Sequence, residues 1–445
     1  MTKTTRSRLK AGVALAVVLA QFAVTAGPAS AFCGFYVAKA DAKLFNKSSK
    51  VVLSRIGRQT AITMASDYQG KPDEFALVVP VPTFIKKDQI RVIDEKTINH
   101  LDAYTAPRLV QYFDDDPCRP IMTATALAVA APPPTGAGRE APAAYPGVTV
   151  EARYNVAEYD ISILSAEQSD GLIRWLTDNG YKIPAGAGPV VGSYIKQKMH
   201  FFVAKVNVKR LKELGRAYLQ PLQVRYETSK FMLPLRLGTV NANGPQDLTI
   251  YTLTPRGRVE ASNYRTVKVP SDIDVPLFVA DDFPSVYKAA FDRAVAREDM
   301  HAVFVEYAWD MAWCDPCAAK PMSNQELTAL GVDWLAGDSG GDASRWPSAT
   351  PPAVFVTRLH VRYDSTSFPE DLNFIETGDR ENFQARYVMH HPFVGGRCQA
   401  AKDYRASLPA RFKQEAANLA DLTGWPQKTI VARMALSGEP VSSAK

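Results

Sequence analysis

The sequence predicts an α+β protein in which mostly antiparallel sheets carry a few packed helices. Short runs rich in β-branched and aromatic residues recur along the chain and are separated by turn residues. Helical patterns are fewer and do not alternate regularly with the strands, as they would in a parallel α/β fold. We therefore expect strands at 50–55, 59–64, 74–81, 148–154, 159–164, 200–208, 222–226, 248–253, 301–307, 354–363 and 383–390.

Three helices are predicted from their end signals and the spacing of their apolar residues. Ser165 and Gln168 form a capping box at the start of the first helix. The second helix begins at Pro284, because proline is well tolerated in the first turn. The third carries an apolar stripe over 408–422 and ends at Gly424, a residue suited to the left-handed C-cap.

The N-terminus has the layout of a secretory signal peptide. A positively charged head precedes an apolar run over 11–26, which is too short to span a bilayer. The small residues Ala29 and Ala31 follow at the spacing that signal peptidase requires. We therefore predict that residues 1–31 are removed by cleavage after Ala31. The mature chain would begin at Phe32, in the periplasm or outside the cell.

Cleavage would also change the charge of the protein. The signal peptide carries four positive charges and no negative ones, so its removal lowers the formal charge from +6 to +2. A strongly basic surface is the main sequence feature that indicates nucleic-acid binding, and a formal charge of +2 does not provide one. No later run approaches about eighteen consecutive apolar residues, so we expect no transmembrane segment after cleavage.

Residues 131–147 divide the mature chain with a segment rich in proline, alanine and glycine. Such a composition cannot bury enough apolar surface to order itself. Two interpretations stay open. The segment is either a linker between a β-rich part, 32–130, and a larger α+β part, 148–445, or a long surface loop within one domain.

Five cysteines remain in the mature chain, and an oxidising compartment favours disulfides between them. Cys314 and Cys317 lie in the pattern Trp-Cys-Asp-Pro-Cys, which resembles the thioredoxin redox motif. We predict a disulfide between Cys314 and Cys317 and a second one between Cys33 and Cys118. Cys398 is then left without a partner.

The Cys-x-x-Cys pattern allows a structural disulfide or a redox centre. A redox centre needs its first thiol at a helix N-terminus, which stabilises the thiolate. Here Ser323 and Glu326 form a capping box, which places the helix start after Cys317. Asp315 would also raise the thiol pKa through its negative charge. A structural disulfide is therefore the preferred interpretation.

In the redox alternative Cys314 is the nucleophile and Cys317 the resolving thiol. Metal binding is a third interpretation of the Cys314–Cys317 pair. A single Cys-x-x-Cys lacks the second pair of a structural zinc site, so we expect no metal. The sequence also offers no motif for a cofactor.

Six blocks of the chain carry a family resemblance. They are Cys33–Val37, Val79–Pro82, Trp313–Cys317, Phe368–Leu372, Asn382–Tyr387 and Leu422–Trp425. In this order they resemble the bacterial domain-of-unknown-function family 2330, over nearly the whole mature chain. The resemblance implies an exported bacterial protein and transfers no activity, ligand or catalytic residue.

The leading hypothesis is an exported, disulfide-braced envelope protein with a structural or binding role and no catalytic activity. Its expected kind of partner is another envelope component. A periplasmic thiol-disulfide oxidoreductase that uses the Cys-x-x-Cys motif is the alternative.

Overall fold

The computed structural model describes residues 29–30, 35–39, 45–69, 75–119, 149–166, 169–183, 186–215, 219–240, 242, 244–313, 315, 320–338 and 353–441. Cys33, Cys314 and Cys317 lie outside these residues, and so does the segment 131–147. All statements below refer to the described residues.

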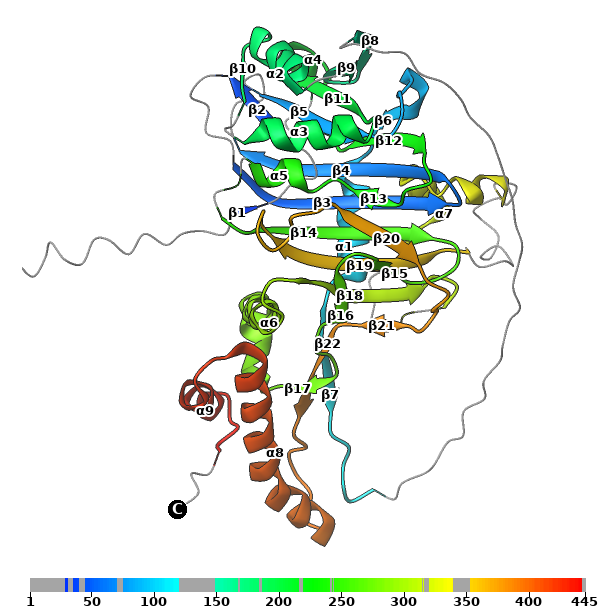
Figure 1. Cartoon of the computed structure of the whole chain (residues 1–445). Helices are drawn as coiled ribbons and strands as arrows, with labels where there is room; N and C mark the ends of the chain where they lie inside the picture. The colour runs from blue at the N-terminus through cyan, green and yellow to red at the C-terminus, as the bar shows by residue number, and fades with distance from the viewer. Residues whose placement is uncertain are drawn as a thin grey trace, which may run out of the picture.

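The largest sheet contains ten strands (Figure 1). They are β1 (Ala29–Ser30), β3 (Phe45–Ile56), β4 (Gln59–Gln69), β6 (Ile90–Val92), β12 (Leu222–Glu227), β14 (Gln246–Thr254), β16 (Arg265–Lys268), β18 (Ala302–Asp310), β19 (Phe355–Tyr363) and β21 (Phe383–Gln384). The order is β16-β18-β19-β14-β3-β4-β12-β6, with β1 beside β14 and β21 beside β18. Most neighbours are antiparallel, but β14 runs parallel to β1 and β3, and β16 parallel to β18.

A second sheet has six antiparallel strands in the order β10-β2-β5-β11-β9-β8. Their bounds are β2 (Phe35–Lys39), β5 (Phe75–Val81), β8 (Thr149–Val156), β9 (Tyr159–Ser165), β10 (Tyr181–Lys182) and β11 (His200–Val206). A short sheet joins β13 (Met232–Leu233), β20 (Leu372–Glu376) and β15 (Val259–Ala261). These sheets and their helices confirm the predicted α+β class with mostly antiparallel strands.

Strands from both sides of the segment 131–147 share the two large sheets. In the six-stranded sheet, β5 pairs with β2 on one side and with β11 on the other. In the ten-stranded sheet, β3 pairs with β14, and β4 pairs with β12. The described strands before this segment therefore join sheets that also contain strands from 148–445.

The apolar cores show four layers: the ten-stranded and six-stranded sheets pack face to face, and helices cover the outer face of each. The outer helices are α1 (Glu95–Thr105), α2 (Ser169–Asp178), α3 (Ala187–Lys196) and α7 (Asn324–Ala329). β11 places Phe202 and Ala204 in the core between the sheets, and Phe201 and Val203 against α2 and α3. This alternation follows from the two-residue period of a strand. The opposite face of the ten-stranded sheet is covered by α1 and α7.

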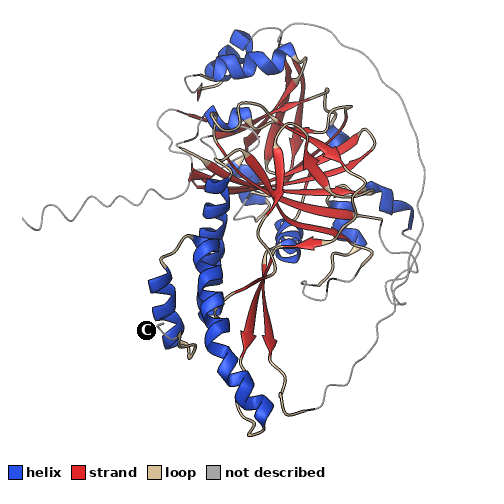
Figure 2. Ribbon diagram, turned by 60° about the horizontal axis from the view of Figure 1, so that its bottom comes forward, coloured by secondary structure: helices blue, strands red, loops and turns tan. Residues whose placement is uncertain are grey.

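An arm extends from the ten-stranded sheet (Figures 1 and 2). It contains the parallel strands β7 (Arg108–Phe113), β22 (Arg386–His391) and β17 (Ile273–Asp274), a 3-10 helix (Leu277–Asp282), α6 (Phe283–Arg297), α8 (Gln399–Thr423) and α9 (Gln427–Leu436). The helices and strands enclose an apolar core of their own. α8 continues through Pro409, supported by Phe412, Ala416 and Leu419 in that core.

Candidate functional site

The Trp-Cys-Asp-Pro-Cys motif directly follows β18, and its aspartate is buried. Asp315 accepts a hydrogen bond of 3.0 Å from the Tyr307 hydroxyl and one of 2.9 Å from Gln384 Nε2. Its side chain therefore points into the protein, toward Tyr307 of β18 and Gln384 of β21. Cys314 and Cys317 themselves lie outside the described residues.

The next helix, α7, begins after the motif. Ser323 caps it: its hydroxyl accepts from the Glu326 amide, and the Glu326 carboxylate accepts from the Ser323 amide at 2.8 Å. This is the predicted capping box, and it fixes the helix start at Asn324. α7 thus begins at Asn324, after the end of the motif.

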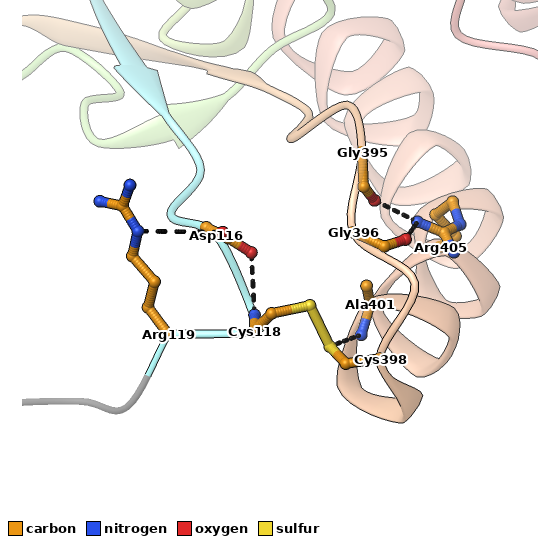
Figure 3. The surroundings of a disulfide bond; sticks show 8 residues. All are labelled: Asp116, Cys118, Arg119, Gly395, Gly396, Cys398, Ala401 and Arg405. Carbon is orange, nitrogen blue, oxygen red and sulfur yellow. Dashed lines mark hydrogen bonds and ion pairs between the residues drawn. A yellow bond between two sulfur atoms is a disulfide. The ribbon is translucent and has the colours of Figure 1, made fainter.

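The structure contains a disulfide between Cys118 and Cys398, at the tip of the arm (Figure 3). The two Cα atoms are 6.0 Å apart, although 280 residues separate the cysteines in the chain. The predicted pair Cys33–Cys118 with Cys398 left over is therefore wrong. The cause lies in the fold: β7 and β22 run parallel, so the segments that follow them leave the sheet at the same end.

Local contacts hold both cysteines in place. The Cys118 amide donates to Asp116 Oδ1 at 2.9 Å, and Cys398 caps α8 by accepting from the Ala401 amide at 3.4 Å (Figure 3). Gly396 has a positive φ of 70°, a conformation that disfavours side chains. Arg405 donates to the carbonyl of Gly396 at 3.1 Å. The cross-link and these bonds close the tip into one unit.

The tip of the arm exposes several apolar side chains. Phe113 is 75% exposed and Val394 is 91% exposed. The Phe113 ring stacks on His391, with centroids 4.4 Å apart, and Tyr112 stacks on His390 at 5.7 Å. His390 and His391 lie on a strand and have different partners: His390 pairs with Asp114 and Asp274, and His391 contacts Gln111. The stacking holds the aromatic side chains in place on the surface, where they are available for contact.

A chain of charged side chains lies on the helix-covered face of the ten-stranded sheet, and sequence reasoning missed it. β19 contributes Arg358, His360 and Arg362, which share one face because they occupy alternate positions. A register irregularity in β18 lies at Glu306, between Val305 and Tyr307. An alternation of charged and apolar residues over 355–363 is the only signal in the sequence that points to this face.

Glu306 is the centre of this charge network and is fully buried. Its carboxylate accepts from Arg358 Nε at 2.6 Å and from the Tyr287 hydroxyl, and it contacts His360 Nδ1 at 2.7 Å. Burial by itself would raise the pKa of Glu306. The charges of His360 and Arg358 and the hydrogen bonds of His360 and Tyr287 outweigh this effect and lower the pKa to about 2. The ionised carboxylate is thus a fixed charge near neutral pH and a poor proton donor.

The network fastens two helices to the sheet. Arg358 Nη1 donates to Asp102 of α1 at 2.6 Å, and Arg362 Nη1 donates to Asp292 of α6 at 2.7 Å. The His360 ring lies parallel to Phe291 of α6, with centroids 3.7 Å apart. Each charge has partners within the network, which is the condition under which buried charges are tolerated. The arrangement favours a structural role over catalysis.

The Phe368–Leu372 block also has a structural role. Asp371 is buried, and its Oδ1 accepts from the Tyr194 hydroxyl at 2.6 Å and from the Leu235 amide at 2.9 Å. It therefore links α3, on the outside of the six-stranded sheet, to the segments next to β13 and β20. Burial raises the pKa of Asp371, and the hydrogen bonds that it accepts oppose this effect.

No group of three or more His, Cys, Asp or Glu side chains in the described part of the chain is arranged to hold a metal ion. No described helix is both long and apolar enough to cross a membrane.

Together, the two packed sheets, the charge network and the cross-linked arm define a disulfide-containing α+β protein. A family model described as "uncharacterized protein conserved in bacteria" matches residues 27–375. The chain belongs to this family, domain-of-unknown-function family 2330, as its sequence blocks predict. The match ends before β22, α8 and α9, which form much of the arm. No curated protein and no solved structure shows a significant match.

Proposed function

We propose that this protein is exported and acts in the bacterial envelope as a binding or structural protein, with the tip of its arm as the contact surface. The Cys118–Cys398 disulfide carries the proposal. Disulfides persist in oxidising compartments and are rare in the bacterial cytoplasm, so a stabilising cross-link is consistent with the leader-like N-terminus.

The exposed side chains of the tip support binding as the role. Phe113 and Val394 are large or branched apolar residues that face solvent at the end of the arm. Aromatic side chains that are held in place contribute contact area at low entropic cost. We propose another envelope protein as the partner, because such a surface fits an apolar patch on a folded protein.

The redox alternative has less support. The Asp315 carboxylate is buried and bonded to Tyr307 and Gln384, and α7 begins well after the motif. Both features are expected if the motif has a structural role. The pKa of the Cys314 thiol and an insulin-reduction assay distinguish the two roles. A thiol pKa near 8.5 without turnover is expected for the structural role, whereas a pKa well below 7 with turnover would establish the redox role.

Cell fractionation with mass mapping of the disulfides tests the proposed location. The chain is expressed with its leader in a bacterial host, and the periplasm, medium and cytoplasm are analysed separately. We expect a mature chain that begins at Phe32, outside the cytoplasm, with Cys118 bonded to Cys398. Recovery of the intact chain from the cytoplasm with both thiols reduced would refute export.

Site-specific photo-crosslinking in living cells tests the proposed contact surface. A photoreactive phenylalanine analogue replaces Phe113, and a control chain carries it at Lys209, an exposed position on α4 (Val208–Glu213). We expect a discrete cross-linked product of higher mass only from position 113. If neither position reacts, or both react alike, the tip is not a specific contact surface.

A further inference from the structure

Two glutamates meet in the core of the arm, where α8, α9 and the 3-10 helix come together. Glu415 on α8 and Glu439, which follows α9, are both 1% exposed. Neither oxygen of Glu415 and only Oε2 of Glu439 has a conventional donor: Oε2 accepts from the Leu277 amide at 3.0 Å. Two buried carboxylates with so few hydrogen-bond donors would carry a large desolvation cost if both were ionised.

The two carboxyl groups are neighbours that influence each other. The charge of Glu439 raises the pKa of Glu415, and a hydrogen bond with Glu415 acts on the pKa of Glu439. Two carboxyl groups can form such a bond only when one of them holds a proton, because an ionised carboxylate is purely an acceptor. The contact between the two glutamates thus requires a bound proton, shared by the pair.

The charges around the pair reinforce this requirement. Arg411 Nε lies 3.3 Å from Glu415 Oε1, but the same guanidinium also binds Asp114, which follows β7. Asp274 of β17 adds a further negative charge, and His390 of β22 lies between Asp114 and Asp274. Tyr404 of α8 donates to Asp114 and carries no charge at neutral pH. The glutamate pair and the two nearby aspartates therefore outnumber the permanent cation Arg411.

The remaining elements bring no compensating charge to the pair. The 3-10 helix faces it with the Leu277 amide. Arg433 of α9 lies over the Phe278 ring, 4.2 Å from its centroid. Burial, followed by the charge of Glu439, raises the pKa of Glu415 to about 8, and burial raises the pKa of Glu439 to about 7.

We propose that the proton shared by Glu415 and Glu439 holds α9 against the arm, and that its loss in mildly alkaline solution releases α9. Glu439 is placed to do this because it connects the end of α9 to the 3-10 helix through the Leu277 amide. Release would uncover Ile430 and Met434, which are fully buried in the arm core. The arm thus contains a pH-sensitive latch, independent of the function proposed for its tip.

The direction of the effect follows from proton linkage. At neutral pH the folded arm holds a proton on the glutamate pair. In the unfolded chain the same glutamates, with a pKa near 4.5, have lost theirs. The stabilisation is complete below about pH 4.5 and is lost as the pH rises through 7 to 8. Each proton linked to docking changes the opening equilibrium by up to about tenfold per pH unit.

Hydrogen exchange measured by mass spectrometry on the oxidised full-length chain tests the latch. Protection factors for peptides covering 427–441 are compared at pH 6, 7, 8 and 9, with the intrinsic exchange rate divided out. We expect protection in the wild type to fall by about tenfold or more between pH 7 and pH 9, while peptides from β19 change little. Constant protection in the wild type would overturn the proposal without any variant.

The variant Glu415→Gln/Glu439→Gln removes the titrating groups and keeps the hydrogen-bonding capacity. We expect its α9 protection to be independent of pH and to exceed that of the wild type at pH 9. Glu381→Gln is the matched control, because Glu381 is an exposed partner of Lys268, and it should behave like the wild type. A double variant that folds and still loses protection as the wild type does would refute the latch.

Discussion

Replacing both cysteines of the arm with serine tests how much the cross-link contributes to stability. The Cys118–Cys398 bond closes a loop of 280 residues. For such a loop the chain-entropy relation gives an upper value of about 5–6 kcal/mol at 25 °C, and measured cross-links typically contribute about 2–4 kcal/mol. We therefore expect the Cys118→Ser/Cys398→Ser variant to lose about 3 kcal/mol of its free energy of unfolding.

Urea unfolding, followed by circular dichroism, measures this loss. Serine at position 398 can still cap α8 through the Ala401 amide, so the comparison isolates the cross-link. Reduced wild type should coincide with the double variant, whereas Cys398→Ala should lose about 1 kcal/mol more through the missing cap. Equal stability of oxidised wild type and double variant, within about 0.5 kcal/mol, would refute the reasoning.

Three further changes probe other parts of the structure. Gly396→Ala should destabilise the tip by at least about 1 kcal/mol, because its Cβ would lie 2.8 Å from Ala401 Cβ at a positive φ. Gly438 also has a positive φ but has open space around it, so Gly438→Ala measures the backbone strain without the close contact, and thermal unfolding should show a larger loss for Gly396→Ala. Arg358→Met should cost about 3–5 kcal/mol by removing the permanent cation beside the buried Glu306, and the double variant Arg358→Met/Glu306→Gln should recover part of this loss. Because the pKa of Glu306 is lowered to about 2, its stabilisation is present above about pH 4.5 and lost as the pH falls towards 2; an acid titration of unfolding should show this slope in the wild type and a smaller one in Glu306→Gln.

The two titrating centres oppose each other in their response to pH. The charge network on the ten-stranded sheet weakens in acid, because the lowered pKa of Glu306 means that folding favours the ionised form. The carboxyl pair in the arm weakens in alkali, because its raised pKa values mean that folding favours the protonated form. The sheets and the arm are therefore expected to lose stability at opposite ends of the pH range.

Local patterns in the sequence predicted most of the longer strands and the best-marked helices. The run Val354–Tyr363 became β19, and Pro284 opens α6 within its first turn. The Ser323 capping box placed the start of α7 at Asn324, because a cap is made by residues three apart in the chain. The helices α1, α3 and α9 were not predicted, since their weaker end signals act together with tertiary packing.

Contacts between distant segments were beyond prediction from one sequence. Cys398 was predicted to be unpaired, yet it bonds to Cys118, because the parallel pairing of β7 and β22 brings the two together. Glu306 and Arg358 belong to strands that are neighbours only in the folded sheet. The spacing of residues along the chain carries no information on these long-range contacts.

The amino-acid sequence by itself determined the fold class, most of the longer strands and the family, because propensities, caps and ordered sequence blocks are local properties. The tertiary structure alone decided the disulfide pairing, the charge network around Glu306 and the meeting of Glu415 with Glu439. These depend on strand order and helix docking, which bring residues up to 280 positions apart into contact.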